Sequence, residues 1–286
     1  MEKQPTPLVK WLGGKRRVLK ELREFYPKEF SCYYEPFLGG GSVLYDVAPQ
    51  KAIVSDSNAE LINAHNVVQS DVKTLITMLE NHAKLNTKEY YLTIRALDRE
   101  VGFSDKFSPA QRAARFIYLN KTGFNGLHRL NKKGENNVPY GSYSNPLIVN
   151  EDNLKSLHAW INFRKIRFMA SHYKIMLNSI QDSGNFIYLD PPYTPTSSTS
   201  SFVGYDKGGF SLNDQKEVRD MAQKLDENGN FVMLSNSDTS ITRELYKDMD
   251  IHPISVRRSV SAASASRINV GELIIIGKTL SESLNK

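Results

Sequence analysis

The tetrapeptide Asp190-Pro191-Pro192-Tyr193 directly follows a short apolar run, Phe186-Ile187-Tyr188-Leu189. A buried strand that ends this way brings a carboxylate, a rigid turn and an aromatic ring to the carboxyl edge of a sheet, where open α/β folds bind ligands. Proline has no backbone N–H, so the two prolines present carbonyl oxygens that only accept hydrogen bonds. A carboxylate and a proline carbonyl together suit a planar –NH2 group, and a base can stack on the tyrosine ring. The plainer alternative is a turn after a strand with an incidental aspartate.

A second group of candidate residues follows the first predicted strand. Glu35-Pro36-Phe37-Leu38-Gly39-Gly40-Gly41-Ser42 is rich in glycine, and Asp56 ends the next predicted strand. Glycines at this position let the backbone approach a nucleotide closely, and an acidic residue at the second strand end can accept hydrogen bonds from ribose hydroxyls. Leu44 stands where the dinucleotide fingerprint has its third glycine, so the pattern favours a nucleoside ligand over a pyrophosphate.

The segment Lys10-Trp11-Leu12-Gly13-Gly14-Lys15 precedes that strand. It lacks the first glycine of a P-loop, and Arg16 replaces the Ser or Thr of that motif, which excludes a P-loop. Two interpretations of Trp11 and Lys15 stay open. Either the ring packs on a nucleoside base while the lysine binds a carboxylate, or the segment combines a core tryptophan with surface lysines.

The charge distribution points to a polyanionic partner. The chain has a net charge of +6, and residues 106–134 contain seven basic residues and no Asp or Glu. Another basic cluster comprises Lys10, Lys15, Arg16, Arg17 and Lys20. Neutralising phosphates with such residues releases counterions and drives binding to nucleic acid. The alternative is two solvated basic faces.

Composition narrows the class of protein. The chain has 286 residues, of which 40% are hydrophobic, and no apolar stretch approaches the length of a membrane span. Its first residues lack the apolar core of a signal peptide, so we expect a cytoplasmic protein. Cys32 is the only cysteine, which excludes an intrachain disulfide. The six histidines show no metal-ligand spacing, so no metal is expected, and His65 and His128 are predicted in loops or at the surface.

Strand and helix patterns alternate along much of the chain. Strands are predicted at 32–37, 51–55, 166–170, 185–189, 230–234, 251–256 and 273–276, and helices at 42–48, 57–82, 87–101, 108–120, 172–180, 212–227 and 239–248. Residues 121–150 are predicted as a loop or hairpin, and 194–201 as a mobile lid or a solvated connector. Such alternation predicts an α/β fold with a mostly parallel sheet and a mainly helical insertion between its second and third strands.

Five motifs in this order resemble the α-group of Dam-type DNA adenine-N6 methyltransferases. They are Lys-Trp-x-Gly-Gly-Lys, Glu-Pro-Phe-x-Gly-x-Gly-Ser, Asp56, Tyr-Leu-Asn-Lys-Thr-Gly-Phe-Asn-Gly-Leu and Asp-Pro-Pro-Tyr, between about Leu8 and about Ile276. The resemblance implies methyl transfer from S-adenosylmethionine to N6 of adenine in double-stranded DNA, within GATC, after the base leaves the helix. It also implies a Rossmann-like methyltransferase domain, residues 1–56 with 165–286, and an inserted, mainly helical DNA-recognition domain, residues 57–164.

The resemblance assigns roles to individual residues. The target adenine would contact Asp190, Pro191 and Tyr193. The cofactor would be held by Trp11, Lys15, Phe37, Gly39, Gly41, Asp56 and Asp190. DNA would be contacted by Lys10, Phe124, Asn125, Leu127, Arg129 and Pro139. Ser142 departs from the best-known members, which have a phosphate-contacting arginine at this position.

These roles imply a monomer that binds DNA at the nucleoid, with no membrane or metal partner. Two alternatives are an enzyme of the same fold that acts on RNA or on a protein amide, and a catalytically silent DNA-binding protein. The basic insertion argues against the first alternative, and the intact Asp-Pro-Pro-Tyr motif argues against the second.

Overall fold

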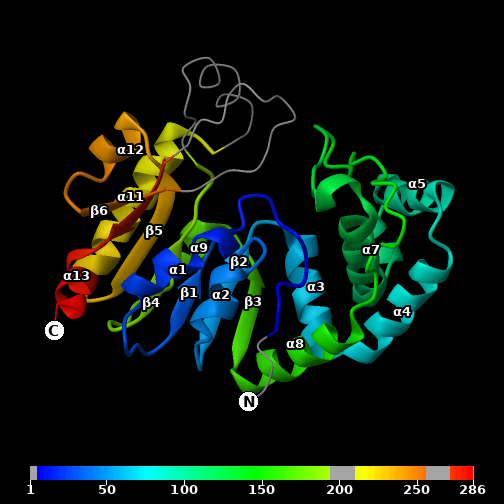
Figure 1. Cartoon of the computed structure of the whole chain (residues 1–286), viewed down its shortest axis with the longest axis horizontal. Coiled ribbons are helices and arrows are strands. Elements are labelled where there is room, and N and C mark those ends of the chain that lie inside the picture. The colour runs from blue at the N-terminus through cyan, green and yellow to red at the C-terminus, as the bar shows by residue number, and fades with distance from the viewer. Residues whose placement is uncertain (1–4, 194–209, 256–270, 286) are drawn as a thin grey trace. The chain divides into compact units, whose positions relative to one another are not determined.

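A computed structural model describes residues 5–193, 210–255 and 271–285 of the chain (Figure 1). The loop predicted at 194–201 and the last residue of the strand predicted at 251–256 lie outside these ranges. Within them, none of the helices combines the length and the apolar character needed to cross a membrane.

Seven strands of the described residues form one sheet, in the order β3-β2-β1-β4-β5-β7-β6. Their bounds are β1 Tyr33–Glu35, β2 Ala52–Asp56, β3 Ile166–Ala170, β4 Phe186–Leu189, β5 Phe231–Ser237, β6 Asp250–Ser255 and β7 Gly271–Ile276. Strand β1 pairs in parallel with β2 and β4, and β4 pairs in parallel with β5. Strand β7 runs antiparallel to both of its neighbours, β5 and β6. Each predicted strand is present, and the Rossmann-like α/β fold is confirmed.

Where the structure describes the chain, the α-helices are α1 Leu19–Leu22, α2 Ser42–Val47, α3 Ala59–Ser70, α4 Val72–Lys84, α5 Lys88–Ala96, α6 Phe103–Lys106, α7 Pro109–Thr122, α8 Glu151–Phe163, α9 Tyr173–Asn178, α11 Leu212–Glu227, α12 Ser240–Leu245 and α13 Lys278–Leu284. Short 3-10 helices are η1 Lys15–Arg17, η2 Arg23–Phe25, η3 Leu97–Arg99 and η4 Phe124–Gly126.

One prediction for the helices needs correction. The single helix predicted at 57–82 is two helices, because Asp71 leaves helical geometry and its side chain accepts a hydrogen bond from Thr74 N to cap α4. Helices α1, α6, α8 and α13 were not predicted at all. The start predicted at Ser108-Pro109 is confirmed, since Ser108 and Gln111 form a capping box at the first turn of α7.

The chain divides into two compact units, and the first comprises Met1–Lys15, Leu38–Gln50 and Ser55–Ser171. In it α3 packs against α7 and α8, and α4 packs against α7. Two amide side chains tie the N-terminal segment to these helices. Asn120 bonds to the backbone of Lys10, and Asn153 bonds to the backbone of Thr6. His65 is only 1% exposed within α3 and stacks on Phe168, so the prediction that it lies in a loop or at the surface was wrong.

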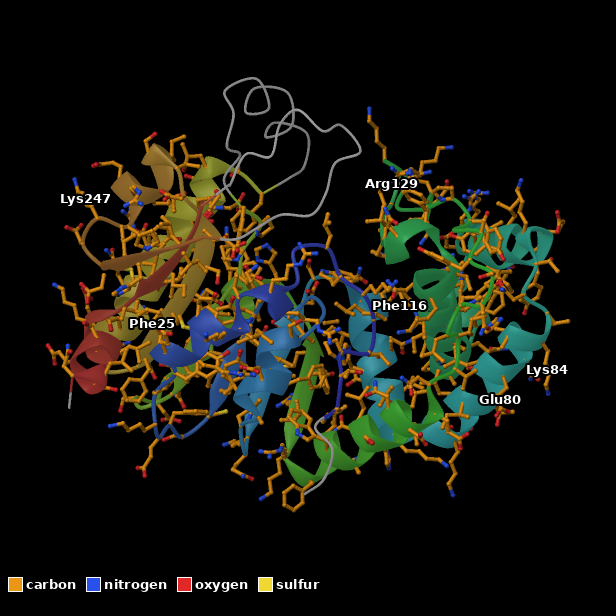
Figure 2. The ribbon with its side chains drawn as sticks, in the orientation of Figure 1. Phe25, Glu80, Lys84, Phe116, Arg129 and Lys247 are labelled. Atoms are coloured by element: carbon orange, nitrogen blue, oxygen red, sulfur yellow. The ribbon has the colours of Figure 1, made fainter. Side chains whose placement is uncertain are left out.

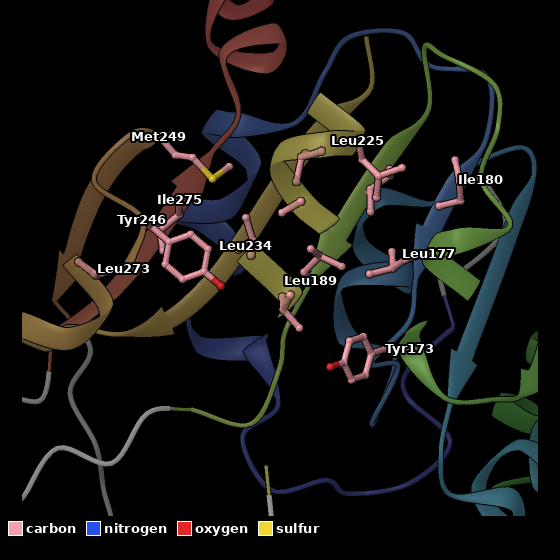
Figure 3. Close-up of a cluster of buried hydrophobic side chains, with 14 residues drawn as sticks. Tyr173, Leu177, Ile180, Leu189, Leu225, Leu234, Tyr246, Met249, Leu273 and Ile275 are labelled. Carbon is pink, nitrogen blue, oxygen red and sulfur yellow. The ribbon is translucent and has the colours of Figure 1, made fainter. Parts of the chain in front are cut away.

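The second unit comprises Arg16–Phe37, Lys51–Val54 and His172–Lys286. Figure 3 shows its hydrophobic core, where Ile187 and Leu189 of β4 pack with residues of α9, α11, β5 and β7. Side chains alternate between the two faces of a strand, and Phe186 contacts Tyr33 on the opposite face. Strand β4 is therefore buried on both faces, as a central strand of a parallel sheet should be. The domain boundaries predicted from the sequence stay a prediction.

Candidate active site and DNA interface

The Asp-Pro-Pro-Tyr turn begins where β4 ends, and buried amides hold it. Gln215 on α11 is fully buried and donates from Nε2 to the Pro192 carbonyl oxygen at 2.6 Å. Its Oε1 accepts from Asn236 Nδ2 at 3.1 Å, and Asn236 Oδ1 accepts from Ser237 N at 2.8 Å. The sequence suggested that both proline carbonyls are available to a ligand. In the structure the Pro192 carbonyl is bonded inside the protein, so the ligand acceptor expected from this pair is that of Pro191.

Two phenols lie in the electrostatic field of Asp190. Burial first, and then the negative charges of Asp190 and Glu272, raise the pKa of Tyr193. Burial and Asp190 likewise raise the pKa of Tyr188, whose hydroxyl bonds to Ser235 Oγ at 2.6 Å. Both phenols are therefore neutral at physiological pH. Tyr193 then offers an uncharged ring, and Asp190 is the acidic group of the turn.

Phe37 follows β1 and lies in an aromatic group of the second unit. Its ring stacks on Tyr173 with centroids 5.1 Å apart and meets the Phe210 ring edge-on at 5.9 Å. These contacts fix the ring at the carboxyl end of β1. The other residues predicted for the cofactor lie in the first unit, apart from Asp190.

Asp56, the last residue of β2, connects the glycine loop to the strand end. Its Oδ2 accepts from Gly39 N and its Oδ1 from Asn58 N, each at 2.9 Å. Burial raises the pKa of Asp56, while these backbone hydrogen bonds lower it. A carboxylate has about four lone-pair sites, so two backbone bonds leave each oxygen able to accept another donor.

Gly39 makes room for Trp11. A Cβ atom at position 39 would lie 2.7 Å from Trp11 Cδ1 and 3.0 Å from Nε1, and φ is +48°. The glycine is thus required by contact with a side chain of the protein, in addition to any approach of a nucleotide that the sequence suggested. The structure brings Trp11, Gly39 and Asp56 together. Gly41, two residues after Gly39, directly precedes α2.

Lys15 is 4% exposed, and its Nζ donates to the Gly13 carbonyl oxygen at 2.9 Å. The alternative of surface lysines around a core tryptophan therefore does not hold for Lys15. A buried ammonium group requires hydrogen-bond acceptors or an anion.

Residues 123–141 form a hairpin-like element, called the recognition hairpin below. Isolated bridges pair Gly123 with Tyr140 and Leu130 with Asn136. Phe124 N donates to the Pro139 carbonyl oxygen at 2.9 Å, and Phe124 is 49% exposed. The hairpin holds five of the six predicted DNA-contacting residues: Phe124, Asn125, Leu127, Arg129 and Pro139.

The sixth, Lys10, lies against this hairpin. A Cβ atom at Gly126 would be 2.6 Å from Lys10 Cδ, so the two segments approach closely, and φ of Gly126 is +64°. The structure thus places all six predicted residues in the first unit, with Lys10 beside the hairpin. Ser142, just beyond the hairpin, has φ +52°.

Asn137 fixes the guanidinium of Arg129, which lies on the hairpin (Figure 2). Arg129 Nε donates to Asn137 Oδ1 at 2.6 Å, and Nη2 donates to the Asn137 carbonyl oxygen at 3.2 Å. One side of the planar fork is therefore engaged within the hairpin. The other edge of the guanidinium, formed by Nη1–H and the remaining Nη2–H, faces away from Asn137. Two N–H groups in one plane can donate to two acceptors of a ligand.

From the sequence, no functional role was predicted for Gln215, Asn137, Asn120 or His128. Gln215 carried a usable signal, because it lies at helical spacing with Val218, Ala222 and Leu225 on the buried face of α11. A polar residue in such a row must have a hydrogen-bond partner inside the protein.

The chain matches the model of the D12 class N6 adenine-specific DNA methyltransferase family over residues 11–260. It is 44% identical over 269 residues to Type II methyltransferase M1.LlaDCHI of Lactococcus lactis subsp. cremoris, with 94% of each chain covered. It is 36% identical over 288 residues to Type II methyltransferase M.MjaIII of Methanocaldococcus jannaschii, covering 94% of this chain and 98% of the relative. It is 32% identical over 278 residues to the DNA adenine methylase of Escherichia coli strain K12, with 96% of each chain covered. The chain therefore belongs to the D12 class of N6 adenine-specific DNA methyltransferases, which act on specific sites in DNA and require a methyl donor.

Proposed function

We propose that this enzyme transfers the methyl group of S-adenosylmethionine to adenine N6 within GATC, with the adenine turned out of the duplex against Asp190, Pro191 and Tyr193. The observation that carries the proposal is the turn after β4. Gln215 engages the Pro192 carbonyl inside the protein at 2.6 Å, so the Asp190 carboxylate and the Pro191 carbonyl form the pair of acceptors. Two acceptors on a rigid turn match the two hydrogens of an exocyclic amine.

The amine needs such acceptors because N6 is a poor nucleophile. Its lone pair is delocalised into the purine ring, and hydrogen bonds to Asp190 and to the Pro191 carbonyl would orient that lone pair out of the ring conjugation. The Asp190 carboxylate would also stabilise positive charge that builds on N6. The contribution of the protein is then positioning and preorganised electrostatics.

Tyr193 would support the extruded base. Taking a base out of the helix costs a few kcal/mol. Stacking on an aromatic side chain returns about 1–3 kcal/mol. Because the pKa of Tyr193 is raised, the ring stays neutral and offers an apolar face at every physiological pH.

The residues near Asp56 fit the proposed cofactor. Asp56 is a carboxylate with remaining lone pairs, which suits the two hydroxyls of a ribose. Trp11 offers an aromatic ring for the adenine, and the ammonium group of Lys15 suits a carboxylate. Phe37, Gly39, Gly41 and Asp190 complete the set. The cofactor supplies an electrophilic methyl group on a sulfonium.

The recognition hairpin and Lys10 would contact the DNA, with Arg129 reading a guanine of GATC. This part of the proposal follows from the motif resemblance and from the preset guanidinium of Arg129. We assign residues 57–164 to recognition and 1–56 with 165–286 to catalysis, in a monomer that acts at the nucleoid.

Methylation of defined duplexes tests the function. The purified chain and S-adenosylmethionine are incubated with a duplex that contains one GATC site and with duplexes changed at each base pair of that site. Nucleoside mass spectrometry then identifies the product. N6-methyladenine formed on the GATC duplex alone is the expected result. Methylated cytosine, or equal methylation of every duplex, would contradict the proposal.

A further inference from the structure

The recognition hairpin contacts the N-terminal segment through one buried amide. Asn120 on α7 is 3% exposed, and its Oδ1 accepts from Lys10 N at 2.9 Å. Its Nδ2 donates to the Lys10 carbonyl oxygen at 2.9 Å and to the Gly126 carbonyl oxygen at 2.8 Å. Both amide protons are therefore used, and one side chain fixes two backbones that are remote in sequence. Leucine of similar size would leave these backbone groups unpaired.

A ring stack connects the same two segments, one residue after Lys10 and two residues after Gly126. The His128 ring stacks on the Trp11 indole with an interplanar angle of 15° and centroids 5.6 Å apart. Phe116 of α7 packs beside both rings, 5.2 Å from His128 and 6.4 Å from Trp11. Burial lowers the pKa of His128, so the stacked imidazole is neutral at physiological pH.

These contacts form a continuous path within the first unit. Asp56 holds Gly39, the edge of Trp11 fills the space that a Cβ on Gly39 would occupy, and His128 covers Trp11. His128 also lies between Leu127 and Arg129 in the chain. One end of the path therefore carries residues proposed for the cofactor, and the other carries residues proposed for DNA.

The His128 ring has space on one side. A cavity of about 190 Å³ is lined by His128, Leu127 and Leu130 of the hairpin and by Asn58 and Glu60, which follow Asp56. The cavity leaves the His128 ring room to be displaced when Arg129 engages DNA, because the ring is not close-packed on that side. A displaced His128 ring changes its stacking contact with Trp11.

We propose that Asn120 and His128 are positioning residues that couple recognition of the target sequence to binding of the cofactor. The proposal rests on the proposed function, in which Trp11 contacts the cofactor and Arg129 reads a base. Coupling of two binding sites is reciprocal and typically changes affinities by about 5- to 150-fold. The cognate duplex should therefore tighten cofactor binding, and a duplex with the guanine replaced should do so less.

Calorimetry with S-adenosylhomocysteine, which has no methyl group to transfer, measures this effect. Its Kd is determined with the GATC duplex and with the guanine-substituted duplex. In the wild type the first Kd should be lower by at least about fivefold. His128→Ala should bring the ratio of the two Kd values close to one, while His128→Phe, which keeps a flat ring, should preserve it.

His82→Ala is the matched control. His82, on α4, is another partly buried imidazole of the first unit. Its ring stacks on Tyr118 of α7, the helix that also carries Phe116, with centroids 4.8 Å apart. This variant should lower the thermal midpoint and leave the Kd ratio unchanged. A Kd ratio that falls equally in His82→Ala, or that survives in His128→Ala, would overturn the coupling.

Fluorescence supplies a second readout. Trp11 and Trp160 are the only tryptophans, so Trp160→Phe leaves Trp11 as the sole reporter. The GATC duplex should shift its emission, and His128→Ala should abolish that shift. A shift that persists in His128→Ala would contradict the proposed path. If the parent protein binds no S-adenosylhomocysteine at all, the proposed function fails, and the coupling fails with it.

Discussion

Gln215 and Pro192 are joined by a hydrogen bond of 2.6 Å, from the buried amide nitrogen of α11 to the carbonyl oxygen of the turn after β4. This bond has two effects on the turn. It fixes the backbone on which Asp190 and Tyr193 are carried, and it leaves the Pro191 carbonyl as the proline acceptor proposed for the substrate. Gln215 is itself held by Asn236 of β5, so the turn is tied to the neighbouring strand.

Replacing Gln215 by leucine should lower kcat more than it lowers substrate affinity. The loss of a buried hydrogen-bond partner destabilises a protein by about 1–3 kcal/mol. A displacement of about 1 Å at reacting groups can reduce the rate by about 100-fold. Steady-state methylation and thermal melting measure the two effects, with Gln223→Leu on the same helix as the control. A lower melting temperature with unchanged kcat would show that Gln215 is purely structural.

Asp190→Ala should reduce methyl transfer by about 10²- to 10³-fold, the usual effect of removing one preorganised hydrogen-bonding group from an active site. The strand and both prolines stay intact, so DNA binding should be kept. Single-turnover methylation gives the rate, and fluorescence anisotropy of a labelled duplex gives the affinity. Asp190→Asn keeps one acceptor oxygen and should lie between the wild type and the alanine variant. A folded alanine variant with near wild-type rate would remove Asp190 from the amine site.

Asp56→Ala should weaken S-adenosylmethionine binding by about 1.5–3 kcal/mol, the range for hydrogen bonds to charged groups. Part of this loss would come through the glycine loop, because Asp56 also holds Gly39 N. Isothermal calorimetry measures the affinity. Asp71→Ala is a suitable control, since Asp71 also accepts from a backbone N–H in the first unit but lies at the start of α4. Unchanged cofactor affinity in Asp56→Ala would exclude this carboxylate from the site.

Arg129→Ala should relax specificity at one guanine, with a loss of about 1–3 kcal/mol at that base pair. A guanidinium fork fits guanine O6 and N7 in one plane, which lysine does not reproduce, so Arg129→Lys should behave like the alanine variant. Asn137→Ala should cause a smaller change in the same direction, since it frees the fork.

Methylation rates on GATC and guanine-substituted duplexes decide between base and phosphate contact at Arg129. A phosphate contact would lower the rate on all duplexes alike and flatten the salt dependence by about one unit. Lys133 is exposed on the same hairpin, so Lys133→Ala serves as the comparison for loss of a phosphate contact. Equal losses on every duplex for Arg129→Ala would refute the base-reading role.

His65 should make the stability of the fold depend on pH. Burial lowers the pKa of His65 from 6.5 to about 4, and its Nδ1 is 2.9 Å from the Leu61 carbonyl oxygen. The unfolded chain binds the proton more readily than the folded chain, so stability is full above about pH 6.5 and falls as pH decreases toward 4. Between pH 7 and pH 5 the loss should be about 2 kcal/mol. Urea unfolding at both pH values measures it, and His65→Phe should reduce the difference. Equal pH dependence in both proteins would contradict this origin.

Features that are determined by residues close together in the sequence could be predicted from it. The strand that ends in Asp190, the glycine loop and the helix start at Ser108 each follow from local periodicity or local hydrogen bonding, and they were predicted correctly. The break at Asp71 was missed because the helical spacing continues across it. The antiparallel orientation of β7 was not predicted, since alternation of strands and helices carries no information on a final strand pair.

Residues that act over long separations could not be assigned from the sequence. Gln215 acts on Pro192, 23 residues away, and Asn120 acts on Lys10, 110 residues away. An asparagine or glutamine in a helix shows its polarity, but its partner is set by the tertiary fold. For the same reason the sequence could not reveal that His128 stacks on Trp11.

The amides that tie the N-terminal segment down also set an order for synthesis of the protein. The hydrogen bonds of Lys10 can form only after Asn120 has been synthesised. Those of Thr6 can form only after Asn153, 147 residues later, has been synthesised. At about 5–20 residues per second the second interval lasts about 7–30 s on the ribosome. Lys10 lacks its partner only until Asn120 is synthesised, whereas Thr6 lacks its partner until Asn153 is synthesised. A fragment that begins at residue 55 would keep helices α3 to α8 but leave the Asn120 amide without Lys10, so we expect these helices to be less stable in that fragment than in the whole chain.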